Sequence, residues 1–198
     1  MELRELAPRL WRWQARHPEW EPPKEKDSPA DWPEVVGSVA YVSGDDTLVL
    51  VDPLVPDDGW RELDALAQER RVRILTTVVF HRRSRAEVVE RYGAVVSNAR
   101  ATLPEGVELI PIDGAREQIV WIPEHGALVP GDRLLGDGDP LRLCPASWMR
   151  YIAGYSVADL RSALRKRLLG LPVRMVLTSH GDPVLHDAHA ALERALAA

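Results

Sequence analysis

The segment Val72-Arg-Ile-Leu-Thr-Thr-Val-Val-Phe80, followed directly by His81-Arg-Arg-Ser-Arg-Ala86, decides the fold of this chain. The first part is nearly all apolar, which predicts a strand over residues 72–80 that is buried on both faces. A helix is expected over residues 58–70, because four apolar side chains there share one helical face. The order strand, helix, strand is typical of an α/β protein.

A second helix follows this segment. Ser84 and Glu87 match a capping box, so the helix is predicted to open at Ser84 and to end at Tyr92-Gly93. Before it, Val35-Val-Gly-Ser-Val-Ala-Tyr-Val42 and Thr47-Leu-Val-Leu-Val-Asp52 flank a Gly-Asp-Asp turn and predict a β-hairpin.

The rest of the chain repeats this order of strands and then helices. We expect strands over residues 93–96, 107–112, 118–122, 127–129, 133–136 and 174–179, helices over 156–169 and 183–197, and a turn over 136–140. Two such halves predict two sheets packed face to face with helices outside. The fold class is therefore α/β, a four-layer αβ/βα sandwich.

Composition narrows the class of protein. The chain has 198 residues, of which 45% are hydrophobic and 28% charged, typical of a globular domain. A net charge of -5 argues against nucleic acid as a partner. No apolar run is long enough to span a membrane and the first residues lack a signal-peptide core, so a cytoplasmic location is expected. Cys144 is the only cysteine, so a disulfide or a cysteine-based zinc cluster is excluded.

Residues 1–34 differ from the remainder, residues 35–198. Four of the seven tryptophans lie here, at positions 11, 13, 20 and 32, beside a charged, proline-containing stretch. We expect an N-terminal arm packed on the core, since exposed tryptophans promote aggregation. His17-Pro-Glu-Trp20 either caps a cleft or anchors the terminus.

Residues 35–198 resemble the metallo-β-lactamase fold, and the sequence pieces that carry the resemblance occur in the family's order. Leu48-Val-Leu-Val-Asp52 is similar to the early strand that ends in Asp, Gly131-Asp132-Arg-Leu-Leu135 to the Gly-Asp strand entry, and Ser179-His180-Gly181-Asp182 to the closing Ser-His-Gly. The resemblance implies the same four-layer sandwich, in which strand ends converge on the site.

The family's His-x-His-x-Asp-His motif is degenerate in this chain. When His81 is matched to the first His, then Arg83, Arg85 and Ala86 occupy the other three ligand positions. The resemblance then leaves three candidate catalytic or metal-ligating residues, His81, Asp132 and His180. A catalytic zinc usually needs three protein ligands and an open position for water, and arginines nearby would repel a dication. No cofactor is therefore expected.

Three functions remain open. The first is a hydrolase-like protein without zinc-dependent hydrolysis that binds an anionic small molecule or a partner, with Arg83, Arg85 and His17 as substrate-binding residues. The second is a metal-dependent hydrolase of esters, lactones or phosphodiesters, with zinc or iron in a mononuclear site at His81, Asp132 and His180. The third is a structural or interaction protein that docks through its Trp-rich arm, with a homodimer possible.

The missing ligands lead to one prediction about charge. A guanidinium group is permanently charged and forked, so it can hold a carboxylate without a metal. We expect Arg82, Arg83 or Arg85 to point into the former metal cavity and to pair with Asp132 or Asp52. The alternative is that all three arginines are solvated beside the helix that Ser84 opens.

Overall fold

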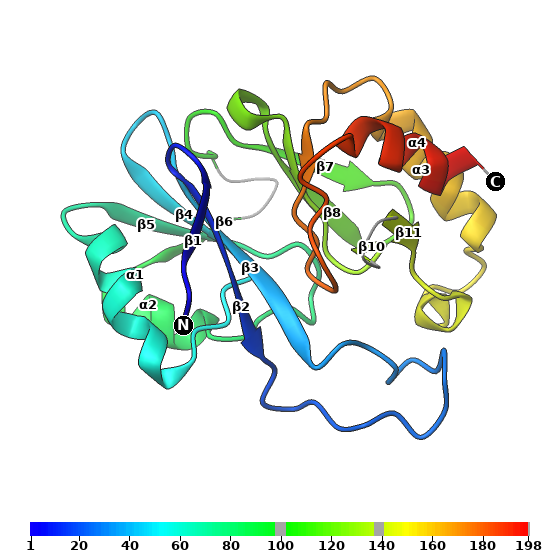
Figure 1. Ribbon diagram of the computed structural model, residues 1–198, viewed down its shortest axis with the longest axis horizontal. Helices are drawn as coiled ribbons and strands as arrows, with labels where there is room; N and C mark the ends of the chain where they lie inside the picture. Colours follow the sequence, from blue (N-terminus) through cyan, green and yellow to red (C-terminus); the bar gives the residue numbers. More distant parts are fainter. Residues whose placement is uncertain (98–101, 137–140, 198) are drawn as a thin grey trace.

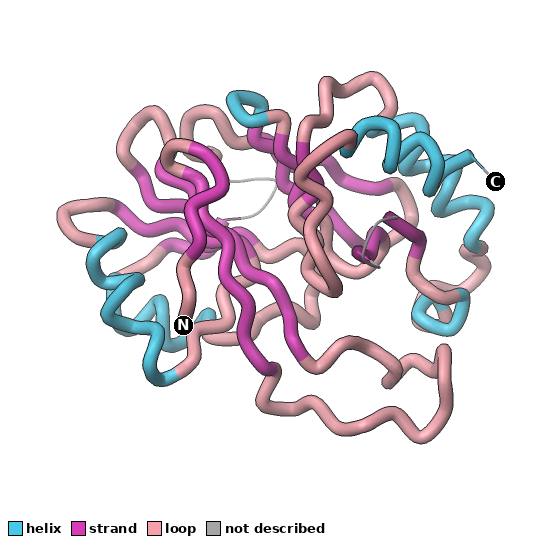
Figure 2. Tube along the Cα trace, viewed as in Figure 1, coloured by secondary structure: helices cyan, strands magenta, loops and turns pink. Residues whose placement is uncertain are grey.

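The computed structural model describes residues 1–97, 102–136 and 141–197 as a mixed α/β protein (Figures 1 and 2). The strands are β1 (Arg4–Ala7), β2 (Leu10–Arg16), β3 (Val35–Val42), β4 (Thr47–Val51), β5 (Arg71–Leu75), β6 (Val95–Ser97), β7 (Glu108–Ile112), β8 (Glu117–Ile122), β9 (Ala127–Val129), β10 (Leu134–Gly136), β11 (Leu141–Leu143) and β12 (Met175–Val176). The α-helices are α1 (Trp60–Ala67), α2 (Arg85–Tyr92), α3 (Val157–Leu168) and α4 (Ala188–Ala197), and the short 3-10 helices are η1 (Asp57–Gly59), η2 (Pro123–His125) and η3 (Ala146–Met149).

Two sheets form the middle of the molecule. One has the strand order β1-β2-β3-β4-β5-β6 and the other β12-β9-β8-β7, while β10 and β11 form a separate antiparallel pair. The parallel pairs are β4 with β5, β5 with β6, and β12 with β9; the other pairs are antiparallel. The predicted hairpin is confirmed, since Val39 of β3 lies opposite Val51 of β4.

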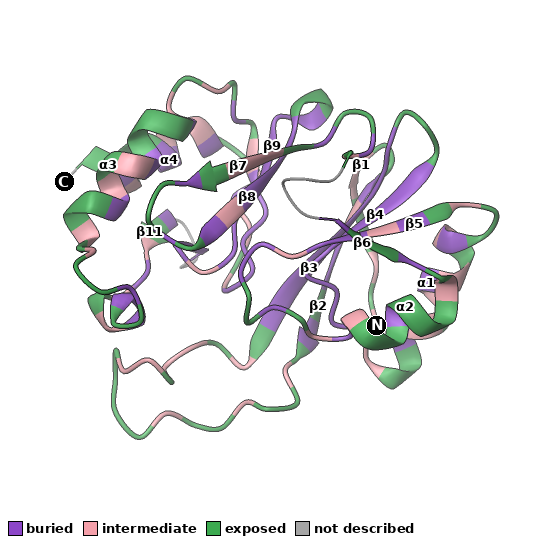
Figure 3. Ribbon diagram, turned by 180° about the vertical axis from the view of Figure 1, so that it is seen from behind, coloured by how far each residue is buried: buried purple, intermediate pink, exposed green. Residues whose placement is uncertain are grey.

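Three apolar clusters show that the layers are those of an αβ/βα sandwich. Along β4, Leu48 and Leu50 pack toward α1 and α2, whereas Val49 and Val51 pack toward the other sheet. The alternation follows from the two-residue period of a strand, which sends neighbouring side chains to opposite faces. A third cluster joins the second sheet to α3 and α4. The interior strands are accordingly buried along their length (Figure 3).

The N-terminal segment differs from the expected arm, because its first half belongs to the sheet. β2 pairs with β3 from Leu10 opposite Tyr41 to Arg16 opposite Val35. Trp13 is 1% exposed and its indole N–H donates to the Leu54 carbonyl at 2.7 Å. None of the four tryptophans of residues 1–34 is exposed. Trp11, Trp13 and Trp32 pack against the apolar clusters, and docking of a partner through this segment stays a prediction.

The buried strand predicted over residues 72–80 ends at Leu75. Two polar residues follow, and the Thr77 backbone N–H donates to the Asp52 carboxylate at 2.9 Å instead of continuing the ladder. The chain then turns, leaving Val79 57% and Phe80 67% exposed. The apolar run over residues 72–80 thus contains the end of a strand and a separate loop. The periodicity of apolar side chains cannot distinguish the two.

The helix ends differ from the prediction in three places. The capping box at Ser84 is wrong: the Ser84 hydroxyl accepts from the Val55 backbone N–H at 2.9 Å and makes no cap bond to α2. Gly93 does end α2 in the left-handed conformation. The first helix was expected from residue 58, but α1 begins at Trp60, after the 3-10 turn η1. The last helix was expected from residue 183, but α4 begins at Ala188, because Val184 forms a β-bridge with Val176.

Most remaining strands confirm the expected positions within one or two residues, namely β6, β7, β8, β9 and β10. The strand expected over residues 174–179 is reduced to β12, and β1, β2 and β11 were not predicted. The turn expected over residues 136–140 falls on positions 137–140, outside the described residues. Within the described ranges, no helix has the length and apolar character needed to cross a membrane.

Candidate functional site

His81 lies in the turn that follows β5, where Asp52 and Thr77 hold it. The Asp52 carboxylate is 2.8 Å from His81 Nδ1, and the Thr77 hydroxyl donates to the same carboxylate. Asp52 directly follows β4 and adopts the left-handed conformation, with φ +47°. Because β4 and β5 are neighbouring parallel strands, their carboxyl ends bring Asp52 and His81 to one edge of the sheet.

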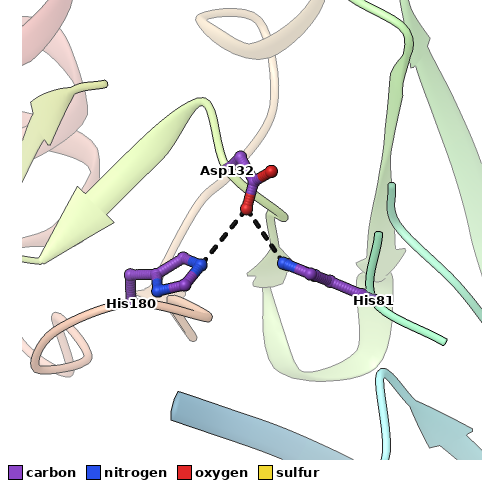
Figure 4. Close-up of side chains that lie close together, drawn as sticks. All are labelled: His81, Asp132 and His180. Carbon is purple, nitrogen blue, oxygen red and sulfur yellow. Dashed lines mark hydrogen bonds and ion pairs between the residues drawn. The ribbon is translucent and has the colours of Figure 1, made fainter. Parts of the chain in front are cut away.

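Asp132 joins the two histidines (Figure 4). Its Oδ1 atom lies 2.9 Å from His81 Nε2 and 3.2 Å from His180 Nε2. Asp132 precedes β10 and His180 follows β12, so the three side chains come from separate elements. The predicted convergence of His81, Asp132 and His180 is confirmed, whereas their catalytic role stays a prediction.

The two carboxylates place positive charge on His81. Burial by itself lowers the pKa of His81, but Asp132 and Asp52 outweigh burial and raise the pKa to about 9. Geometry agrees, because each ring nitrogen faces a carboxylate oxygen, and only the doubly protonated imidazolium donates to both. His81 and His180 in turn outweigh burial at Asp132 and keep the pKa of that carboxyl well below its usual range.

Glu117 holds the backbone that presents Asp132. Its Oε2 atom accepts from the backbone N–H groups of Asp132 at 2.7 Å and Arg133 at 3.0 Å, and its Oε1 atom accepts from Gly131 at 3.1 Å. Burial, followed by repulsion from Asp132, raises the pKa of Glu117 to about 7. Glu117 was not predicted as a site residue, because a glutamate at the start of an apolar strand is ordinarily a solvated edge residue.

Arg83 points inward, as expected, but it does not bind a carboxylate. Its Nη1 donates to the carbonyls of Gly37 at 2.7 Å and Asp52 at 2.8 Å, and its Nη2 donates to the Ser179 hydroxyl at 2.7 Å. The predicted pairing with the Asp52 or Asp132 carboxylate is therefore wrong. The guanidinium group instead ties β3, the end of β4 and the loop before His180 together.

A cavity of about 350 Å³ opens above the Asp132 oxygen. Side chains that carry or can acquire positive charge outnumber acidic ones along its wall. The former are His17, His81, Arg83, Arg133 and His180, and the latter are Glu19 and Asp132. Trp32, Phe80, Trp148 and Tyr151 supply most of the apolar wall, and none of these four was predicted as a site residue. The cavity therefore combines an aromatic wall with a polar base.

The loop over residues 17–34 closes one side of this cavity. The Trp148 indole of η3 donates to the Ser28 carbonyl at 3.3 Å, and the Ser147 hydroxyl donates to the Asp27 carbonyl. The Trp32 ring then lies edge-on to His17, with centroids 5.0 Å apart, and 6.1 Å from His180. His17 therefore lines the cavity, while its role as a cap of the cleft or as an anchor of the terminus stays a prediction.

Two residues singled out in the sequence lie elsewhere. Arg85 begins α2 and lines a different hollow, so no contact of the cavity supports its expected role in binding substrate. Cys144 is buried, as its sequence context indicated, and burial raises the pKa of its thiol to about 11. A thiol with that pKa stays protonated near neutral pH and is a poor nucleophile.

The three donors fit one metal ion in chemical type and spacing. The donor atoms of His81, Asp132 and His180 lie within 4.8 Å of one another. A tetrahedral zinc site with ligands at about 2.0–2.1 Å separates its donors by about 3.3 Å, close to the distances in this cluster. Asp52 on Nδ1 would then orient His81 as carboxylates orient metal-bound histidines. Among the described residues, no further His, Cys, Asp or Glu joins this group, so it does not fit a two-metal centre.

Comparison with known proteins identifies the fold. No family model and no curated protein matches the chain. Solved structures match over almost its whole length: a metallo-beta-lactamase of Erythrobacter litoralis in its mono-zinc form has a TM-score of 0.63 at 18% identity, covering 99% of this chain and 94% of that one.

Two further matches carry other descriptions. A metallo-beta-lactamase family protein of Thermus thermophilus has a TM-score of 0.56 at 16% identity, over 96% of this chain and 79% of that one. The metal-soaked Flv1 flavodiiron core of Synechocystis has a TM-score of 0.61 at 14% identity, over 99% of this chain and 60% of that one. Together with the αβ/βα layers, these matches identify the chain as a protein of the metallo-β-lactamase fold.

Proposed function

We propose that the chain binds a small organic anion with a flat apolar body in the cavity above Asp132. The observation that carries the proposal is the cavity wall, in which five basic or protonatable side chains face two acidic ones beside four aromatic rings. An anionic group would approach His17 and Arg133, and the aromatic rings would contact the body of the ligand.

A positively charged His81 supports binding without a metal ion. The carboxylates of Asp52 and Asp132 lie on either side of its ring. A proton on Nε2 of His81 thus occupies the direction in which a metal ion would bind, and a metal must displace it. Asp132 is thereby neutralised by an imidazolium group, so it does not offset the guanidinium charges of Arg83 and Arg133 in the wall. Both guanidinium groups also donate to backbone carbonyls, and burial lowers the pKa of His17 and of His180.

Charge-matched ligands test this proposal. Titration calorimetry would compare 2-naphthoate with the uncharged 2-naphthamide, which has the same aromatic body. We expect the acid to bind at least tenfold more tightly, and His17→Gln to weaken acid binding several-fold. His186→Gln, at an exposed position outside the cavity, is the matched control and should bind like the parent. Equal affinity for acid and amide would contradict the proposal.

The donor spacing favours a second candidate, a mononuclear metal-dependent hydrolase of esters, lactones or phosphodiesters. His81, Asp132 and His180 would hold the ion. A bound zinc or iron ion would act as a Lewis acid and lower the pKa of a bound water to about 7. The chain's own part would be to orient His81 through Asp52, to place Asp132 through Glu117, and to exclude water with Trp32 and Trp148.

Metal analysis of protein purified without chelators distinguishes the two candidates. One zinc or iron per chain, lost in His180→Gln and kept in His189→Gln, would favour the hydrolase. Chelator-sensitive turnover of ester, lactone or phosphodiester substrates would then establish it. Anion binding that is unchanged by chelation, in protein without stoichiometric metal, would favour the first proposal.

A further inference from the structure

A second hollow, of about 830 Å³, lies away from the cavity above Asp132. Its wall consists of the turn after β5, the start of α2, the edge strand β6 and the β7–β8 hairpin. No residue lines both hollows. We call it the arginine groove, after Arg82, Arg85 and Arg116 in its wall.

In the described part of the chain, no hydrogen bond or ion pair engages the guanidinium groups of Arg82, Arg85 or Arg116. Many other surface arginines are paired, such as Arg91, whose Nη2 lies 2.6 Å from the Asp64 carboxylate. The groove therefore gathers three cationic groups that no described side chain pairs with.

The acidic side chains of the groove do not neutralise this charge. Asp113 lines it, but its carboxylate accepts two hydrogen bonds from Arg167, at 2.9 and 3.2 Å. Glu117 also lines it, but its oxygens accept the backbone N–H groups of residues 131–133. Asp113 is paired with Arg167, and Glu117 lies 4.0 Å from the Arg133 guanidinium group, so each carboxylate already faces another cation, and no ion pair within the described ranges joins either to the three arginines. This cluster of cations contrasts with the net charge of -5 of the whole chain.

Exposed apolar surface adjoins the guanidinium groups. Val79 is 57% and Val96 41% exposed, and both line the groove beside the buried Val78. Apolar side chains next to several cations suit a ligand with a compact, multiply charged end and an organic body. Phosphate chains have this charge density, and the guanidinium fork matches phosphate oxygens through paired hydrogen bonds.

We propose that the arginine groove binds a compact polyphosphate group, as in an organic di- or triphosphate, through Arg82, Arg85 and Arg116. The two arms of the site come from different parts of the chain. Arg82 precedes α2 and Arg85 is the first residue of that helix, whereas Arg116 lies in the β7–β8 hairpin. A bound anion would therefore bridge the two sheets at the edges formed by β6 and β7. The proposal is independent of the function assigned to the cavity above Asp132.

Charge-matched variants test this site. The probe is inorganic tripolyphosphate, titrated calorimetrically into the full chain at low ionic strength, with orthophosphate for comparison. The groove variant carries Arg82→Gln, Arg85→Gln and Arg116→Gln. The control variant carries Arg4→Gln, Lys166→Gln and Arg194→Gln, which removes the same charge from exposed positions outside the groove.

We expect tripolyphosphate to bind the parent and the control variant with affinities within about threefold, and at least tenfold more tightly than orthophosphate. The groove variant should lose at least tenfold in affinity while its melting temperature matches that of the control. Saturating 2-naphthoate should leave tripolyphosphate binding unchanged. Equal losses of tripolyphosphate affinity in the two variants would mean that net charge alone causes the binding, and this would overturn the proposal. Competition by 2-naphthoate, or no binding to the parent at millimolar concentration, would overturn it equally.

Discussion

The Glu117 carboxylate accepts the backbone N–H of Asp132 at 2.7 Å, so a buried acid on β8 fixes the position of the acid that joins both histidines. The contact links the start of β8 to the cavity, because the same carboxylate also accepts the N–H groups of Gly131 and Arg133. Hydrogen bonds to a charged acceptor are stronger than neutral ones. Glu117 is therefore a positioning residue for Asp132.

Glu117→Gln should destabilise the protein, since an amide offers one oxygen where the carboxylate offers two, and its NH2 group would face a backbone donor. We expect a loss of about 2 kcal/mol in the free energy of unfolding, which lowers the melting temperature by about 4–8 °C for a chain of this size. Glu108→Gln, at an exposed position of β7, is the control and should melt like the parent. Indistinguishable melting of the two variants would refute a positioning role.

The pH dependence of stability reports the charge on His81. Its pKa is raised to about 9 from the unfolded value of 6.5. Because the folded state raises this pKa, protonated His81 stabilises the fold fully below pH 6.5, and that stabilisation is lost as the pH rises through 9. In chelator-treated protein, the free energy of unfolding of the parent should fall by about 3 kcal/mol over this pH range. The free energy of unfolding of His81→Gln should depend less on pH. Denaturant titrations between pH 6.5 and 9.5 measure the difference, with His186→Gln as control. Parallel profiles for parent and His81→Gln would contradict a charged His81.

Arg83 and Arg85 should differ sharply, although only two positions separate them. Arg83→Gln removes donors from the Gly37 and Asp52 carbonyls and from the Ser179 hydroxyl. We expect a loss of about 3 kcal/mol, because buried acceptors would be left without partners. Arg85→Gln should change stability by less than about 0.5 kcal/mol, as surface substitutions usually do. Urea unfolding of the pair measures this, and equal stability of the two variants would rule out the bridging role of Arg83.

Phe80 and Tyr151 should contribute to ligand binding more than to folding. Their rings lie 6.2 Å apart in the cavity wall, yet they are 67% and 54% exposed. Phe80→Ala should therefore leave the melting temperature within about 2 °C of the parent, since little buried area is lost. It should weaken 2-naphthoate binding about three- to tenfold. Val95→Ala, on an exposed apolar side chain of β6, should not change the affinity. Unchanged binding in Phe80→Ala would exclude this ring from the ligand site.

The sequence by itself determined the fold class and singled out the three side chains that meet in the cavity. Alternation along Val35–Val42 and Thr47–Val51 predicted the hairpin, since the two-residue period of a strand is written directly in the order of apolar side chains. The resemblance selected His81, Asp132 and His180, and the structure brings all three together.

Only the tertiary structure decided how those residues are supported. The partners of Glu117 lie 14 to 16 positions away in the chain, and the partners of Arg83 as many as 96 positions away. Local periodicity carries no information about contacts of this kind, which arise where strand ends from two sheets meet. The same reason explains why Ser84, with the spacing of a helix cap, bonds to Val55 instead, and why the tryptophan-rich N-terminus became strand β2 and a cavity wall. Burial of apolar surface between distant segments outweighs the local preference.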